Sequence, residues 1–306
     1  MSSVNFNPDE DIPDLAGKVI FITGGTNGLG AASAVHFAKH NAAHIYISGR
    51  NVQSAQEVIE RIRGSGSKSD ITFVECDLAS LSSVEEAAET FISQTAQLDI
   101  LMCNAGIVAQ PPSLTADGYE LQFGTNHLGH ALLIRKFLPI LQNSAREDTD
   151  ARIVILTSDA CMLHPKGGIV FDKLRTGQDF WLGGPWLRYG QSKLANLLYA
   201  RELSHRFPDV TSVSVHPGVV ATNMLSGSGY VTRALIYATS RDKPLKPDEG
   251  AYNQVWAAIA PREKIENGMY YEPVGHLAEK KLDKIARVDA LAARLWDWTE
   301  EALRTF

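Results

Sequence analysis

The sequence lacks the features that mark several protein classes. It holds only three cysteines in 306 residues, Cys76, Cys103 and Cys161, without C-x-x-C spacing. Neither a disulfide framework nor a thiolate zinc site is expected, and reduced thiols are typical of an intracellular protein. No run of 18 apolar residues occurs, and residues 1–15 lack the cationic start and apolar core of a secretory signal. We therefore expect a cytoplasmic protein without a membrane-spanning helix.

Other absences narrow the choice of partners. The chain carries 29 basic and 35 acidic residues, a net charge of -6, and no basic cluster that could follow a phosphate backbone, so nucleic acid is not an expected partner. His36, His40 and His44 are spaced by four, but no third ligand type accompanies them, so no metal site is predicted. A P-loop is excluded because no Gly-Lys-Ser or Gly-Lys-Thr follows the glycines.

Short apolar segments alternate with helical patterns along the chain. Strands are expected at residues 18–23, 44–48, 71–75, 99–103, 152–157, 213–216 and 268–271. Helices are expected at about 28–40, 51–63, 81–97, 118–141, 187–207, 248–260 and up to about 303. This order predicts a single-domain α/β fold of the Rossmann type, a doubly wound parallel sheet of about seven strands with helices on both faces. Residues 1–16 are interpreted as a flexible leader and 17–306 as the domain.

A glycine-rich turn follows the first expected strand. It reads Thr23-Gly24-Gly25-Thr26-Asn27-Gly28-Leu29-Gly30 and leads into a helix, where free N–H groups and the helix dipole favour a pyrophosphate. The simpler alternative is an ordinary glycine-rich loop. Dinucleotide folds that prefer NAD carry an acidic residue about 20 positions later, but no Asp or Glu lies between Gly30 and Glu57. Arg50 stands at the end of the second strand instead, which predicts NADP(H) over NAD(H), unless Arg50 is only a solvated surface charge.

Tyr189 and Lys193 are four residues apart in an expected helix. This spacing places phenol and ammonium on one face, where the cation favours the phenolate and tyrosine becomes a usable acid or base. Read alone, Tyr189 could equally be a core aromatic of an amphipathic helix.

These motifs together resemble the short-chain dehydrogenase/reductase family over residues 18–271, in particular its retinol-dehydrogenase-like branch without the membrane anchor that many of its members carry. The resemblance implies four catalytic residues: Asn126, Ser158, Tyr189 and Lys193. It implies that the cofactor is bound by Gly24, Thr26, Asn27, Gly28, Leu29, Gly30, Arg50, Asp77, Leu78, Asn104, Ala105, Gly106, Tyr189, Lys193, Pro217, Gly218, Val219 and Thr222. Cys103 departs from the family, which more often has asparagine there. The family also forms homodimers and homotetramers, either of which is an expectation here.

The segment between Ser158 and Tyr189 is longer than the shortest members of the family need. We expect this insertion, about 159–186, to lie over the carboxyl ends of the strands, with a lid at about 219–247. Its apolar residues would line a substrate pocket together with Ser158 and Tyr189: Met162, Leu163, Trp181 and Trp186. The alternative is that they only pack the insertion onto its own domain.

The sequence thus predicts an NADP(H)-dependent oxidoreductase that interconverts a carbonyl and a secondary alcohol. The substrate expected is a hydrophobic ketone or alcohol, with aromatic and polycyclic compounds among the candidates. A different class is a catalytically idle protein that senses NADP on the same fold. A nucleotide-sugar epimerase would require another glycine spacing and a larger C-terminal domain.

Overall fold

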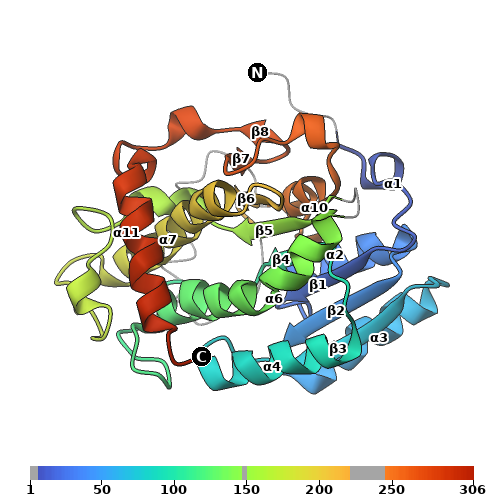
Figure 1. Cartoon of the computed structure of the whole chain (residues 1–306), viewed down its shortest axis with the longest axis horizontal. Helices are drawn as coiled ribbons and strands as arrows, with labels where there is room; N and C mark the ends of the chain where they lie inside the picture. The colour runs from blue at the N-terminus through green and yellow to red at the C-terminus, as the bar shows by residue number, and fades with distance from the viewer. Residues whose placement is uncertain (1–5, 147–149, 221–244) are drawn as a thin grey trace.

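The computed structural model describes residues 6–146, 150–220 and 245–306 (Figure 1). Of the predicted lid, residues 221–244 lie outside the described residues, and so does Thr222.

The strands form one sheet in the order β3-β2-β1-β4-β5-β6-β7-β8, and every neighbouring pair is parallel except β7 and β8. Their bounds are Val19–Thr23 (β1), His44–Gly49 (β2), Asp70–Glu75 (β3), Ile100–Cys103 (β4), Arg152–Leu156 (β5), Thr211–Val215 (β6), Tyr270–Glu272 (β7) and His276–Leu277 (β8). The predicted doubly wound fold is confirmed, with β8 as a two-residue addition at the edge. The strand order reverses between β1 and β4, which is where such sheets bind ligands.

Helices cover both faces of the sheet. They are α1 (Pro8–Asp11), α2 (Gly28–Lys39), α3 (Val52–Gly64), α4 (Leu81–Gln94), α5 (Leu121–Phe123), α6 (Gly129–Arg146), α7 (Gly184–Arg206), α9 (Pro247–Gly250), α10 (Tyr252–Ile259) and α11 (Asp289–Ala302). Short turns of other helix types are η1 (Gly124–Leu128, a π-helix), η2 (Asp159–Leu163), η3 (Phe171–Lys173), η5 (Arg262–Lys264), η6 (Glu279–Lys281) and η7 (Ile285–Arg287).

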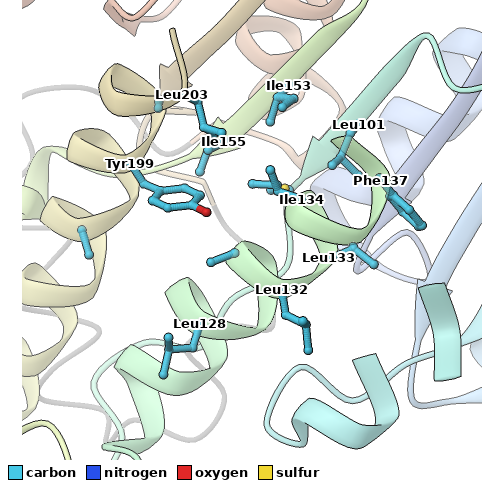
Figure 2. Close-up of a cluster of buried hydrophobic side chains, with 14 of the residues drawn as sticks. Leu101, Leu128, Leu132, Leu133, Ile134, Phe137, Ile153, Ile155, Tyr199 and Leu203 are labelled. Carbon is cyan, nitrogen blue, oxygen red and sulfur yellow. The ribbon is translucent and has the colours of Figure 1, made fainter. Parts of the chain in front are cut away.

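The alternation of side chains along each strand divides the core into two layers. Phe21 and Ile153 contribute to the core under α4, α6 and α7, whereas Ile20 and Val154 contribute to the core under α2, α3 and α10. Figure 2 shows the first layer, in which side chains from β4, β5, α6 and α7 meet, Tyr199 among them. Helix α11 packs along α7 on the outside of this layer (Figure 1).

The predicted flexible leader does not hold for residues 6–16. Phe6, Ile12 and Leu15 are each less than 10% exposed and pack into the core layer of α2 and α10. Between them lies the short helix α1, and Asn7 caps it by accepting a hydrogen bond from the N–H of Asp9. This segment therefore belongs to the packed domain.

The helix expected over residues 118–141 is interrupted. Between α5 and α6 lies the π-helix Gly124–Leu128, where the N–H of Gly129 bonds the carbonyl of Gly124. A bond between residues five apart widens the helix by one residue, a feature that is frequent at functional sites. Asn126 lies in the middle of this π-turn.

Candidate active site

The glycine turn has the backbone shape that a pyrophosphate site requires. Gly24 and Gly28 have φ angles of +64° and +54°, in the left-handed region that favours glycine. A Cβ on Gly30 would lie 2.4 Å from the carbonyl oxygen of Gly24, so only glycine fits this close approach. Asn27 caps α2 by accepting a hydrogen bond of 2.7 Å from the N–H of Gly28. The turn thus leads the positive end of α2 to the edge where the strand order reverses.

Thr23 and Asn104 fasten this turn to the end of β4. The Thr23 hydroxyl oxygen accepts hydrogen bonds from the N–H groups of Asn104 (2.9 Å) and Ala105 (3.0 Å). The Asn104 side-chain amide donates to the Thr23 carbonyl at 2.8 Å, and its oxygen accepts from Gln254 of α10 at 3.1 Å. Asn104 therefore holds β1, β4 and α10 together directly behind the glycine turn. A Cβ on the nearby Gly106 would lie 3.1 Å from the side-chain oxygen of Asn126, a tight contact.

Arg50 follows β2 beside the glycine turn. The N–H of Gly25 bonds the carbonyl of Ser48 at 3.1 Å, and a Cβ on Gly49 would lie 2.9 Å from the Thr26 hydroxyl, so turn and strand end are in close contact. The Arg50 side chain is exposed, and no ion pair involves it among the described residues. A guanidinium is thus available next to the turn.

Two more predicted cofactor segments lie at the carboxyl ends of strands. After β3, the Asp77 carboxylate accepts a hydrogen bond from the N–H of Ala79, and Leu78 is buried beside Gly129. After β6 come Pro217, Gly218 with a φ of +88°, and Val219, whose carbonyl accepts from the N–H of Leu245. All the described segments predicted to contact the cofactor therefore meet along one edge of the sheet.

Asn126 is fully buried and hydrogen-bonded through its whole side chain. Its oxygen accepts from the N–H of Ile107 at 2.8 Å, and its amide donates to the Ile107 carbonyl at 3.0 Å and to the Ser192 hydroxyl at 2.9 Å. Ser192 in turn donates to the Tyr189 carbonyl at 2.8 Å. These bonds place Asn126 between the loop after β4 and the helix α7 that carries Tyr189 and Lys193.

Lys193 reaches into the same space. Its ammonium donates to the carbonyl of Leu156 at 3.0 Å and lies 5.7 Å from the centroid of the Tyr189 ring. The side chain is almost completely buried, and this burial lowers the pKa of Lys193 to about 8.

The Tyr189 phenol lies near the Ser158 side chain. Burial is the main influence on the phenol and raises the pKa of Tyr189, while the hydrogen bond with the Ser158 side chain opposes this rise. The Ser158 hydroxyl itself donates to the Asp159 carboxylate at 3.0 Å. The expectation that Lys193 lowers the tyrosine pKa is therefore not met in the protein alone, because burial outweighs the other influences.

The four predicted substrate-lining residues of the insertion differ in their surroundings. The Trp186 ring meets the Tyr189 ring edge to face at a centroid distance of 6.0 Å, so it lies against Tyr189. Met162 and Leu163, in η2, are partly exposed at 37% and 51%. Trp181 is 99% exposed, so no described side chain covers it, and it forms no pocket wall in this structure.

Two features of this region were not predicted from the sequence. A Cβ on Gly190 would lie 2.6 Å from the carbonyl of Ala160, so this glycine lets η2 lie directly on α7 next to Tyr189. Arg188 is fully buried, pairs with buried Glu120 at 3.4 Å, and donates to the carbonyls of Gln178 and Gln110. The position of Gly190 directly after Tyr189 could have indicated the close contact of η2 with α7. No local pattern in the sequence indicates the buried pair of Arg188 and Glu120.

Within the described ranges, no group of three or more His, Cys, Asp or Glu side chains could hold a metal ion. His36 lies 3.1 Å from the Asp248 carboxylate, and His44 stacks on Tyr46. None of the described helices combines the length and the apolar character needed to span a bilayer. All three cysteines are buried and free.

Comparison with known proteins yields several extensive matches. A sequence model described as short chain dehydrogenase matches residues 18–173. The chain is 35% identical to the short-chain dehydrogenase/reductase drtF of Aspergillus calidoustus, over 96% of both chains. It is 37% identical to an uncharacterized oxidoreductase of Schizosaccharomyces pombe, over 95% of this chain and 86% of that protein. The human WW domain-containing oxidoreductase is 34% identical over 84% of this chain and 62% of its own length.

Solved structures match over similar lengths. An uncharacterized protein from Mycobacterium paratuberculosis superposes with a TM-score of 0.73 at 28% identity, covering 98% of this chain and 97% of that one. An NADPH-bound carbonyl reductase from chicken fatty liver gives a TM-score of 0.65 at 23% identity, covering 86% and 99%, a likeness of fold alone.

Proposed function

The chain belongs to the short-chain dehydrogenase/reductase family, and on this premise we propose that it is an NADP(H)-dependent oxidoreductase of the cytoplasm that interconverts a carbonyl and a secondary alcohol. The observation that carries the proposal is the assembly of Tyr189, Ser158, Lys193 and Asn126 at the edge of the sheet where the glycine turn lies. A catalytically idle binding protein would have no need for this complete set.

The glycine turn, the start of α2 and the segments after β2, β3, β4 and β6 fit a dinucleotide, which when bound supplies the hydride. In the reductive direction the Ser158 hydroxyl holds the carbonyl oxygen of the substrate, and Tyr189 donates its proton to that oxygen as the hydride reaches the carbon. The product is an alcohol whose two added hydrogens come from the hydride and from the Tyr189 proton. The raised pKa of Tyr189 means that the phenol holds its proton at neutral pH, as a proton donor must.

Lys193 returns a proton to Tyr189, and Asn126 holds the helix that carries both residues. With a pKa of about 8, the Lys193 ammonium readily exchanges a proton near neutral pH, and it lies 5.7 Å from the centroid of the Tyr189 ring. The Asn126 amide fixes Ser192, which holds the Tyr189 carbonyl, so the turn and α7 keep their spacing during the reaction.

The preference for NADP(H) rests on Arg50. Its guanidinium is free of described ion pairs, lies next to the turn, and has no acidic residue nearby in the sequence to bind a ribose hydroxyl in its place. The insertion supports a hydrophobic substrate, since Trp186 lies against Tyr189 with Val108 and Ala160 in the same apolar cluster.

The test is a screen of the purified protein with NADPH and with NADH against aromatic, polycyclic and small aliphatic ketones. We expect turnover with NADPH at least about tenfold more efficient than with NADH, since a bidentate charged pair contributes more than 1.4 kcal/mol. Arg50→Asp should reverse this preference, and Arg50→Lys should keep part of it. Wild-type protein that turns over no ketone with either cofactor would refute the activity, and an unchanged cofactor ratio in Arg50→Asp would refute the role of Arg50.

A further inference from the structure

His130 is a buried histidine of α6 that lies between two parts of the candidate site. It is 2% exposed, and both ring nitrogens contact oxygen atoms. Nδ1 lies 2.9 Å from the main-chain carbonyl oxygen of Asn126, and Nε2 lies 2.8 Å from the hydroxyl of Thr23. One ring thus spans from the π-turn, which carries the catalytic asparagine, to the end of β1, where the cofactor turn begins.

The hydrogen bonds around Thr23 fix the role of Nε2. A hydroxyl has two lone pairs and one proton. Both lone pairs of the Thr23 hydroxyl are used, because it accepts from the N–H groups of Asn104 at 2.9 Å and Ala105 at 3.0 Å. Its proton must therefore be donated, either to His130 Nε2 at 2.8 Å or to the Met102 carbonyl at 3.4 Å. The shorter contact makes Nε2 the acceptor, so Nε2 carries no proton.

The contact at the other side of the ring agrees with this assignment. A carbonyl oxygen can only accept, so the Nδ1 atom at 2.9 Å from the Asn126 oxygen must carry a proton. The two contacts independently define one neutral form of the imidazole, with its proton on Nδ1. The pKa of His130 is consistent with a neutral ring, since burial lowers it to about 4.

We propose that His130 is a positioning residue that holds Asn126 and the π-turn at a fixed place relative to the cofactor turn, through its neutral form protonated on Nδ1. The order of donation is continuous: main-chain N–H groups after β4 donate to Thr23, Thr23 donates to His130, and His130 donates to Asn126. The proposal rests on the proposed function, because Asn126 is a relay residue only in an active reductase.

The physical reason for such a device is the π-turn itself. At Gly124–Leu128 the helix departs from its regular four-residue bonding, so its carbonyl groups are less firmly directed by the helix alone. A rigid ring anchored on Thr23 gives the Asn126 carbonyl a partner of fixed direction. The Asn126 side chain then keeps its bonds to Ile107 and Ser192, and through Ser192 to the helix of Tyr189.

Two amide substitutions separate the two ends of the ring. In His130→Asn the side-chain nitrogen stands where Nδ1 stands and still donates to Asn126, but it does not reach Thr23. In His130→Gln the amide reaches the depth of Nε2 and contacts Thr23, but leaves the Asn126 carbonyl without its donor. The span needs both contacts, so we expect His130→Asn, His130→Gln and His130→Leu each to lose kcat by roughly ten- to hundredfold, the cost of displacing a catalytic group by about an ångström.

The Kd for NADPH, measured by fluorescence, should change by less than about threefold in His130→Asn and His130→Gln, because neither substitution alters the groups that face the cofactor. Wild-type kcat in any one of the three folded variants would overturn the proposal.

A spectroscopic arm needs neither substrate nor variant. In protein labelled with ¹⁵N-histidine, the imidazole signals of His130 should be those of a neutral ring protonated on Nδ1, and Thr23→Val should change them. A ring protonated on Nε2, or doubly protonated at pH 7, would overturn the assignment even if the activity is confirmed. Conversely, an inactive wild-type protein with the expected signals would refute the proposed function and leave the hydrogen-bond order intact.

Discussion

Asn126 and Lys193 are buried and firmly bonded, whereas the tip of the insertion before Tyr189, residues 181–182, is exposed. Asn126 and Lys193 are at most 4% exposed, and each bonds main-chain atoms of a neighbouring strand or loop. At the tip, Trp181 and Leu182 are 99% and 80% exposed. Groups fixed by the backbone have one position, as proton transfer requires, whereas an exposed tip can change without disturbing the fold. Under the proposed function, the chemistry belongs to the buried part and substrate choice to the insertion.

Tyr189→Phe is expected to reduce kcat more than any other substitution proposed here. It removes the proton donor but keeps the ring that packs against Trp186, so we expect kcat to fall by about 10³-fold or more. The Kd for NADPH and the melting temperature should remain close to wild type. Full turnover in this variant would show that the buried groups are structural only.

Arg188→Met tests how firmly α7 holds the part of the insertion around Gln178. The substitution leaves the Glu120 carboxylate buried without its partner, and we expect a loss of about 3–5 kcal/mol in the free energy of unfolding. Burial already raises the pKa of Glu120, so the unpaired group stabilises the fold less as pH rises, and the loss should be larger at pH 8 than at pH 5.

The matched control is the double variant Glu120→Gln with Arg188→Met, which buries no charge at this site. Denaturation with urea should show that the double variant recovers most of the lost free energy of unfolding. The difference from wild type should no longer depend on pH. If Arg188→Met alone is as stable as wild type, the Arg188 contacts do not hold the insertion firmly.

Lys193→Met separates activity from stability. The pKa of Lys193 is about 8 in the folded protein and 10.5 in an exposed lysine, so between these values the unfolded state binds more protons and folding stability rises with pH. Below this window the buried ammonium lowers stability. After subtracting the lost bond to Leu156, we expect the cofactor-free variant to be about 2 kcal/mol more stable at pH 7, though inactive.

This gain should shrink as the pH approaches 10.5, where the wild-type lysine is neutral in the folded state and half neutral in the unfolded state. Urea denaturation at pH 7 and pH 10 measures it, with Tyr189→Phe as an inactive control that keeps Lys193. An equal difference at both pH values would contradict the lowered pKa.

Trp181→Ala carries the smallest expected effect. Because the side chain makes no described contacts, the free energy of unfolding should change by less than about 0.5 kcal/mol. If the tip contributes to substrate binding, KM should rise about two- to fivefold for a polycyclic ketone and remain unchanged for a small aliphatic one. Ile92→Ala, at an exposed apolar position of α4, serves as the control and should leave both KM values unchanged.

The sequence supports prediction well where the signal is local. The strands β1 and β2 are continuous apolar segments, and the Gly24-x-x-x-Gly28-x-Gly30 spacing and the Tyr189-x-x-x-Lys193 spacing each encode their own geometry. The π-turn could not be predicted, because residues 118–141 read as one helical pattern and the partner that holds Asn126 is Ile107, 19 residues earlier. The packed leader was missed for the same reason, since Phe6, Ile12 and Leu15 are isolated apolar residues in a polar segment whose partners lie far along the chain.

The contacts of α11 determine when the π-turn can become fully packed during synthesis of the chain. Thr299 in α11 contacts His127 of the π-turn at 3.0 Å, and the carbonyls of Ala302 and Leu303 accept hydrogen bonds from Tyr119 and Arg135 on either side of that turn. A ribosome synthesises Thr299 172 positions after His127. Because a domain folds as a unit, the π-turn gains its full set of contacts only after α11 has emerged from the ribosome.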